Sequence, residues 1–117
     1  MIAAILKELS ERVSQFRGVV LTGMDGLPIG RIVPPDSRFE QLVIEHIAVQ
    51  KRLRSHMDSF DFGLPREFTV VGERLKLIIL AVNEDYFLAL GVGPEENIGR
   101  ARYELRRAAI PLKRELS

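Results

Sequence analysis

The chain has 117 residues, of which 46% are hydrophobic and 28% are charged, and its formal net charge is +1. This length and balance predict one globular domain over residues 1–117. The absence of cysteine excludes disulfides, thiolate nucleophiles and zinc sites built on cysteine. The longest apolar run, Leu77–Val82, is too short to cross a bilayer, and charges follow the apolar start at once. We therefore expect a cytoplasmic protein without a signal peptide or membrane insertion.

The chain begins with a predicted helix followed by a hairpin. Apolar residues recur at helical spacing over residues 2–16, and Gly18 is expected to end this helix. Two β-branched runs follow, Gly18–Thr22 and Leu27–Ile32. Between them, the pair Asp25 and Gly26 favours a hairpin turn with a positive φ angle at the glycine.

A second helix is predicted from a capping box at Ser37 and Glu40 to about Phe60. Its main apolar stripe consists of Phe39, Leu42, Val49, Leu53 and Met57. His46 falls in this stripe, where a histidine is more often a core or interface group than a metal ligand. A second apolar patch lies on the flank of the helix and consists of Val43, Ile44, Ile47 and Ala48. Because one stripe suffices for the helix's own sheet, the second patch predicts a partner.

The second half of the chain is predicted to form three strands and a last helix. The strands are expected over Glu67–Val71, Leu75–Val82 and Tyr86–Val92, with tight turns between them. Asn97 is expected to cap the last helix, which Pro111 should kink or restart. This helix is basic, and it is interpreted first as a solvated surface and second as a contact for nucleic acid or an acidic protein.

The order α-β-β-α-β-β-β-α predicts an α/β sandwich of the α+β type. Hairpin-length connections make most of the sheet antiparallel. The strand at 75–82 is apolar on both faces, so we expect two helices on one face of the sheet and one on the other. If the last three strands form a meander, the strand at 67–71 lies at a sheet edge. There Phe68 and Val70, with the neighbouring backbone, favour pairing with another copy.

No pattern in the sequence predicts catalysis. The stretch GVVLTGMDGLPIG at residues 18–30 is rich in glycine, but it lacks the Lys and Ser/Thr of a phosphate-binding loop and leads into a strand. His46 and His56 are ten positions apart, too far along one helix to share a metal ion. Paired acids fall in predicted turns, and the nucleophile-elbow spacing is absent. The sequence therefore predicts no catalytic residue, no cofactor and no metal site.

Three stretches resemble the Roadblock family, the dynein light-chain and MglB-type modules. GVVLTGMDGLPIG resembles the family's first hairpin, and LKLIILAVNEDYFLALGVG resembles its final strand pair. ENIGRARYELRRA resembles the start of its last helix, with Asn97, Ile98, Gly99 and Arg102 in the family's pattern. From its place beside the apolar stripe, Arg102 is expected to reach a carboxylate or carbonyl in a structural role, more than to contact a partner.

The resemblance implies a five-stranded antiparallel sheet with the central helix on one face and the terminal helices on the other. It also implies a homodimer that pairs central helices and edge strands, which agrees with the apolar patch and edge strand above. In function it implies a non-enzymatic regulator or scaffold of a Ras-like small GTPase, in the manner of MglB, which stimulates GTP hydrolysis. Contacts to the GTPase are expected from Glu40, Lys51 and Arg54, around Ile44 and Ile47.

Two other functions stay open at this stage. One is a passive adaptor dimer in a motor or signalling complex, without effect on nucleotide turnover. The other is a small-ligand or nucleic-acid-binding module that uses the basic last helix, although nucleic acid is the less expected partner. The sequence does not distinguish stimulated hydrolysis from nucleotide exchange or localisation, and it does not identify the GTPase.

Overall fold

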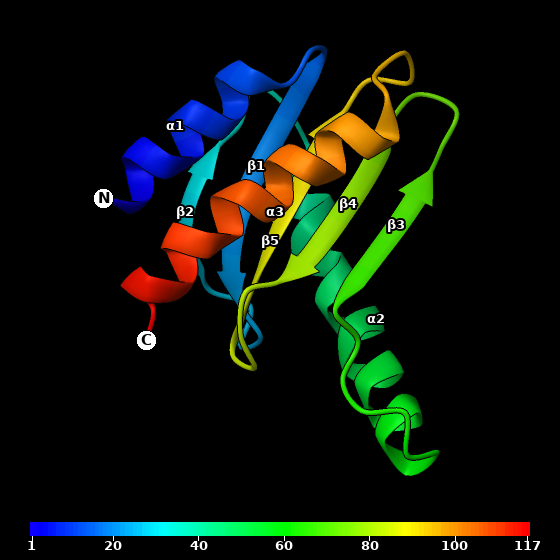
Figure 1. Cartoon of the computed structure of the whole chain (residues 1–117). Helices are drawn as coiled ribbons and strands as arrows, with labels where there is room; N and C mark the ends of the chain where they lie inside the picture. The colour runs from blue at the N-terminus through cyan, green and yellow to red at the C-terminus, as the bar shows by residue number, and fades with distance from the viewer.

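The computed structural model describes residues 1–117 and has the predicted order of elements (Figure 1). Its three helices are α1 (Ile2–Arg12), α2 (Phe39–Ser59) and α3 (Ile98–Glu115). Its five strands are β1 (Phe16–Gly23), β2 (Pro28–Ile32), β3 (Glu67–Val71), β4 (Lys76–Ala81) and β5 (Tyr86–Val92). None of the helices combines the length and the apolar character needed to span a membrane.

The five strands form one antiparallel sheet in the order β2-β1-β5-β4-β3. The last three strands form a meander, which confirms that β3 lies at an edge. The other edge is β2, the second strand of the first hairpin. At the turn of this hairpin Gly26 has a φ angle of 89°, as predicted, and Asp25 Oδ1 accepts a hydrogen bond from the Leu27 N–H at 3.0 Å.

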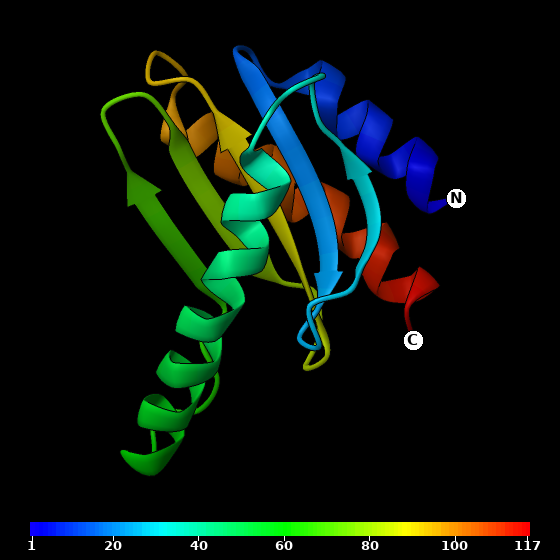
Figure 2. The ribbon, with the colours of Figure 1, turned by 180° about the vertical axis from the view of Figure 1, so that it is seen from behind.

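The sheet is covered on both faces, as predicted from the apolar strand β4. Helices α1 and α3 lie on one face and α2 lies alone on the other (Figures 1 and 2). Side chains of β4 alternate between the two layers: Ile78 packs beneath α1 and α3, whereas Leu77 and Ile79 pack beneath α2. Since successive residues of a strand point to opposite faces, a strand between two layers must be apolar throughout.

The two cores differ in size. The core beneath α1 and α3 contains 14 buried apolar residues, whereas the core beneath α2 contains eight. In the smaller core the ring of Phe39 lies on two cross-strand neighbours, Gly18 and Gly91. A Cβ atom added at Gly18 would come within 2.5 Å of this ring, so the glycine is needed for close packing. The prediction that Gly18 ends the first helix is therefore wrong.

The prediction of a first helix over residues 2–16 is wrong in its last turn. Helix α1 ends at Arg12, Gln15 takes a φ of 51°, and Phe16 already belongs to β1. The buried carboxylate of Glu96 accepts hydrogen bonds from the Ser14 N–H at 2.6 Å and the Ser14 hydroxyl at 2.7 Å. These bonds give the backbone at the turn a partner outside the helix. The spacing of apolar residues alone does not reveal such a partner.

Glu96 also accepts a hydrogen bond from the Asn97 N–H at 2.8 Å. Burial disfavours the charged carboxylate, but the hydrogen bonds from Ser14 and Asn97 outweigh it, with help from Arg100. The pKa of Glu96 consequently lies below its ordinary value of 4.5. The carboxylate thus joins the α1–β1 turn to the start of α3.

One prediction about a helix end is wrong. The capping box does not form: α2 begins at Phe39 after Arg38, Ser37 Oγ accepts from the Phe39 N–H, and Glu40 pairs with Arg31 instead. Helix α3 is capped by Asn97, whose Oδ1 accepts from the Arg100 N–H at 3.0 Å, as predicted. It does not restart at Pro111, because one helix continues through this position to Glu115.

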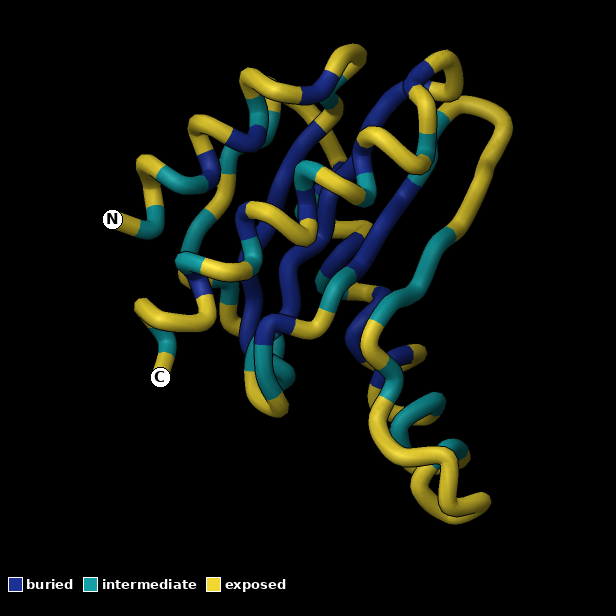
Figure 3. The backbone as a smooth tube through the Cα atoms, viewed as in Figure 1, coloured by how far each residue is buried: buried dark blue, intermediate teal, exposed yellow.

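Helix α2 extends beyond the sheet that it covers. Its first half crosses the sheet, whereas its second half projects past the end of the sheet near the start of β3, and the following loop returns along it to β3 (Figure 2). The projecting end is mostly exposed, in contrast to the dark centre of the sheet (Figure 3). We call residues 58–62, the last turn of α2 and the start of the loop, the overhang.

Candidate interaction surface

The structure divides each of the two predicted apolar stripes of α2 between the core and the surface. Val43 and Ile47, predicted to lie in a separate interface patch, are only 0% and 6% exposed and belong to the chain's own core. Leu42 and Val49, predicted to lie in the sheet-facing stripe, are 43% and 48% exposed. Because Phe39 of the main stripe is buried and Ala48 of the patch is exposed, the side of α2 that faces the sheet lies between the two predicted stripes.

One flank of α2 faces the edge strand β3. The ring of His46 lies 4.6 Å from that of Phe68 in β3, measured between centroids. Leu42 and Val49 are one turn from His46 along the same side of the helix, and Leu53 is one turn beyond Val49. We call the side formed by Leu42, His46, Val49, Leu53, His56 and Phe60 the β3 flank.

His46 and Gln50 form a polar contact beneath the β3 flank. Both are buried, and the Gln50 Nε2 atom lies 2.9 Å from His46 Nε2. Since an amide nitrogen can only donate, His46 accepts at Nε2 and is neutral in this arrangement. Burial also lowers the pKa of His46 below its ordinary value of 6.5. His46 is therefore a packed group of the α2–β3 contact, in line with its predicted core or interface role.

The strand β3 continues this apolar surface to the edge of the sheet. Phe68 is half-buried against the core beneath α2, while Val70 and Val71 are exposed. One side of β3 pairs with β4, and the other side has no strand beside it. An exposed edge without proline or lysine is open to pairing with another strand.

The opposite flank of α2 faces β2 and has a different character. Glu40 Oε1 lies 3.0 Å from Arg31 Nε in β2, and Ile44 and Lys51 are on the same side of the helix. We call the side formed by Glu40, Ile44 and Lys51 the β2 flank. Beside it, Ile29 of β2 is exposed and points to the same face of the sheet as Arg31. This flank is mixed in charge, with apolar residues between the charged ones.

The other residues predicted to face a partner are placed as follows. Ala48 is exposed on the outer side of α2, and Arg54 is half-buried with its guanidinium donating to the Glu84 carbonyl at 3.0 Å. The sequence thus found three charged residues of α2 that remain near its surface, of which Glu40 and Arg54 already have partners in the chain.

Arg102 has an intramolecular partner, as its structural role requires. Its Nε donates to Glu67 Oε2 at 2.6 Å, and Arg106 donates to the other oxygen of the same carboxylate at 3.0 Å. Glu67 opens β3, so the two arginines attach the edge strand to α3 on the face away from α2. Gly99 lies in the first turn of α3, close to the cap Asn97.

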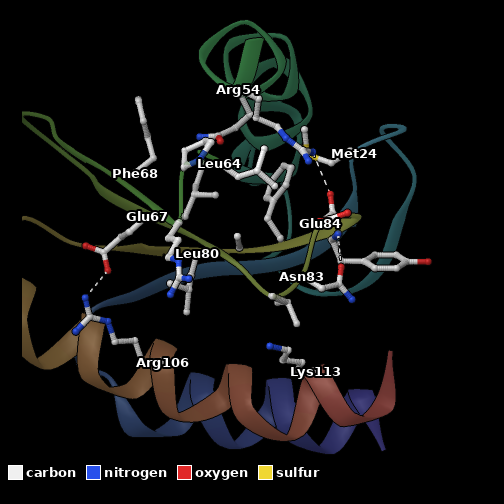
Figure 4. A pocket seen from close by; sticks show the side chains of 18 residues that line it. Met24, Arg54, Leu64, Glu67, Phe68, Leu80, Asn83, Glu84, Arg106 and Lys113 are labelled. Atoms are coloured by element: carbon white, nitrogen blue, oxygen red, sulfur yellow. Dashed lines mark hydrogen bonds and ion pairs between the residues drawn. The ribbon is translucent and has the colours of Figure 1, made fainter. Parts of the chain in front are cut away.

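A cavity of about 680 Å³ lies between the projecting part of α2, the end of the sheet and α3 (Figure 4). Three of its six charged side chains have partners: Glu67 pairs with Arg106, and Arg54 donates to the backbone of Glu84. The chain has no group of three or more histidine, aspartate or glutamate residues able to hold a metal ion. The cavity brings together no nucleophile, base and orienting group of the kind that catalysis needs.

Sequence reasoning missed the overhang and a hollow at the other end of α2. Phe60 and Phe62 in the overhang are 71% and 77% exposed. The hollow has a volume of about 430 Å³ and is lined by Arg17, Pro34, Ser37, Arg38, Phe39, Leu42 and Leu75. The aromatic pair separated by one aspartate was visible in the sequence, but its exposure depends on where the sheet ends.

The architecture is closely similar to that of several solved structures. A Roadblock/LC7 domain from Streptomyces avermitilis superposes with a TM-score of 0.85 at 20% identity, over 97% of this chain and 95% of the other. MglB from Myxococcus xanthus superposes with a TM-score of 0.89 at 14% identity, over 98% of this chain and 94% of the other. The gliding protein MglB from Thermus thermophilus superposes with a TM-score of 0.83 at 17% identity, over 95% of this chain and 84% of the other.

Comparison of the sequence with protein-family models and with curated proteins finds no match. The likeness therefore lies in the arrangement of the elements over nearly the whole chain, as the order and spacing of the three resembling stretches had suggested. The chain has the fold of the Roadblock/LC7 domain and of MglB.

Proposed function

We propose that the protein is a homodimeric, non-enzymatic regulator or scaffold of a Ras-like small GTPase. The observation that carries the proposal is the unpartnered apolar surface of the β3 flank and strand β3, on a fold similar to that of MglB. Leu42, Val49 and Val70 are each more than 40% exposed on this surface. A second copy that pairs with it through a two-fold axis would cover both the flank and the free strand edge.

The two flanks of α2 then have separate roles. When two copies meet through the β3 flank, the β2 flank of each copy stays accessible, with Glu40, Ile44 and Lys51 facing outward. This surface combines exposed charges with the apolar side chains of Ile44 and Ile29, as protein interfaces do. We assign the GTPase contact to it, which keeps two of the charged residues named from the sequence, Glu40 and Lys51. Arg54 is left to a supporting role, because its guanidinium is already bound.

The dimer is tested by the mass in solution. Light scattering of the purified protein should give about twice the chain mass of 13.3 kDa. Val49→Asp should produce the monomer, because an unpaired carboxylate would be buried in an apolar contact. Ala48→Asp is the matched control: it is the next residue on the same helix, is also exposed, and points away from the β3 flank. A wild type that stays monomeric at high micromolar concentration contradicts the proposal.

The GTPase contact is tested with a Ras-like GTPase encoded in the same genome. Single-turnover GTP hydrolysis and nucleotide release are measured with wild type, Lys51→Glu and Val49→Asp. Lys51→Glu should weaken binding to the GTPase while the mass remains that of a dimer. Val49→Asp should lose the dimer but keep binding to the GTPase, because the β2 flank belongs to a single copy. If Lys51→Glu and Glu40→Lys bind the GTPase as the wild type does, the β2 flank is not the contact. An adaptor without effect on turnover would bind the GTPase and leave both rates unchanged.

A further inference from the structure

The overhang carries apolar side chains that nothing in the chain covers. Phe60 and Phe62 are the most exposed large apolar residues after the initial Met1. The aspartates Asp58 and Asp61 accompany them, and no lysine or arginine lies between residues 55 and 65. Two exposed aromatic rings with two carboxylates form an acidic, apolar knob.

The hollow beside the N-terminal end of α2 has the opposite charge. Its apolar lining includes Phe39, Leu42 and Leu75, and its charged lining is Arg17 and Arg38, both exposed. Neither arginine is ion-paired within the chain, and the same is true of Asp58 and Asp61. The hollow therefore complements the overhang in both polarity and charge, but it lies at the other end of the same helix.

The β3 flank has a symmetry that brings these two ends together. Counted from position 51, Val49 and Leu53 lie two residues before and after, and Leu42 and Phe60 lie nine before and after. His46 and His56 lie five before and after. An antiparallel pair of α2 helices with its two-fold axis at position 51 would therefore place Leu42 opposite Phe60 of the second copy. The apolar pairs Leu42–Phe60 and Val49–Leu53 would then form across the axis, with His46 opposite His56 between them.

We infer that the overhang of each copy docks in the hollow of the other, and that this exchange sets the register of the dimer. The inference rests on the proposed homodimer and adds to it the residues that fix its alignment. Phe60 and Phe62 enter the hollow beside Leu42, and the carboxylates of Asp58 and Asp61 approach Arg17 and Arg38. A two-fold axis makes both contacts twice. The symmetric apolar stripe, the free aromatic rings and the unpaired charges all point to a second copy as the occupant.

The register is tested by disulfide cross-linking, for which a chain without cysteine offers a clean background. Leu42→Cys and Phe60→Cys are prepared separately, mixed, oxidised and compared on a non-reducing gel. The mixture should form a covalent dimer, because the two positions face each other across the axis. Each variant alone should stay uncross-linked, since identical positions lie about 27 Å apart along the antiparallel helices.

A charge exchange gives a second measurement. Arg38→Asp and Asp61→Arg should each raise the dimer dissociation constant, by roughly tenfold, and the double variant should recover most of the loss. Tyr103→Ala, which removes an exposed aromatic ring from the outer side of α3, is the control and should leave the constant unchanged.

The outcomes separate this inference from the proposed dimer. A dimer by light scattering whose mixture does not cross-link, or in which Leu42→Cys links to itself, overturns the docking of the overhang and leaves the dimer standing. A double charge variant as weak as the single ones also contradicts the docking. A wild type that is monomeric in solution overturns both proposals.

Discussion

The two faces of the sheet differ in how completely they are closed. On one face, α1 and α3 cover a core of 14 apolar residues. There Glu67 joins β3 to α3, and Glu96 joins the α1–β1 turn to the start of α3. On the other face, α2 covers eight apolar residues, leaves an apolar flank exposed and extends past the sheet. The first face supplies most of the burial that stabilises the chain, whereas the second offers surface to other molecules.

The largest expected effect comes from a truncation on the closed face. Leu105→Ala removes a fully buried side chain beneath α3 and should lower the free energy of unfolding by about 2–5 kcal/mol. Leu42→Ala, the same change on the exposed flank of α2, should cost the isolated chain less than about 1 kcal/mol but weaken self-association. Chemical denaturation and light scattering of both variants measure the two quantities. Equal losses of chain stability would mean that the faces do not differ as described.

A smaller effect is expected in the hairpin between β1 and β2. Gly26→Ala should destabilise the chain by about 1 kcal/mol or slightly more, because alanine is strained at a φ of 89°. A Cβ atom there has space, its nearest neighbour being Ile47 Cδ1 at 3.8 Å, so the cost is in the backbone. Thermal unfolding measures the loss. Tight GTP or ATP binding by the wild type, abolished in this variant, would contradict the assignment of the glycine-rich stretch to a turn.

Arg102→Ala tests the attachment of the edge strand to the closed face. The Arg102 side chain is 30% exposed and the Glu67 side chain is 22% exposed, so solvent weakens their ion pair. Since Arg106 keeps one bond to Glu67, we expect a loss of only about 0.5–1 kcal/mol in unfolding free energy. GTPase binding should be unchanged, and Arg107→Ala on the outer side of α3 serves as the control. Unchanged melting with abolished GTPase binding would assign Arg102 to a partner instead.

The two faces should also differ, more subtly, in the pH at which each loses stability. The folded pKa of His46 lies below its ordinary 6.5, so the unfolded chain binds this proton more readily. The contribution of His46 on the α2 face to the free energy of unfolding should therefore be complete above pH 6.5 and decrease as the pH falls below it. The folded pKa of Glu96 lies below 4.5, so the closed face keeps its contribution down to that pH and loses it on further acidification.

Variants at the two positions separate these pH ranges. His46→Gln should flatten the dependence of unfolding free energy on pH just below 6.5, and Glu96→Gln should flatten it below 4.5. Denaturant titrations at a series of pH values make the measurement. A His46→Gln profile identical to that of the wild type between about pH 5 and 7 would rule out the burial of a neutral histidine.

The sequence predicted what depends on local pattern. Strand β4 is apolar at nearly every position because both its faces are covered, and this alone required a three-layer arrangement. Gly26 and Asn97 were placed correctly because a turn glycine and a helix cap act within a few residues of themselves. Local pattern also made the predicted first helix too long. Val13 and Phe16 continue the helical spacing, but they pack on the core from a turn and a strand.

The tertiary structure decided which side of each helix faces the sheet and which distant segments each element contacts. Helix α2 has two apolar stripes, and periodicity does not tell that the sheet contacts residues of both. The glycine pair Gly18 and Gly91 selects the rotation by admitting the ring of Phe39, which brings Val43 and Ile47 inward and leaves Leu42 and Val49 outside. In the same way, Ser14 meets Glu96 across 82 positions of sequence, and Glu67 meets Arg102 across 35. Such contacts depend on where the sheet places distant segments, which no local pattern of residues records.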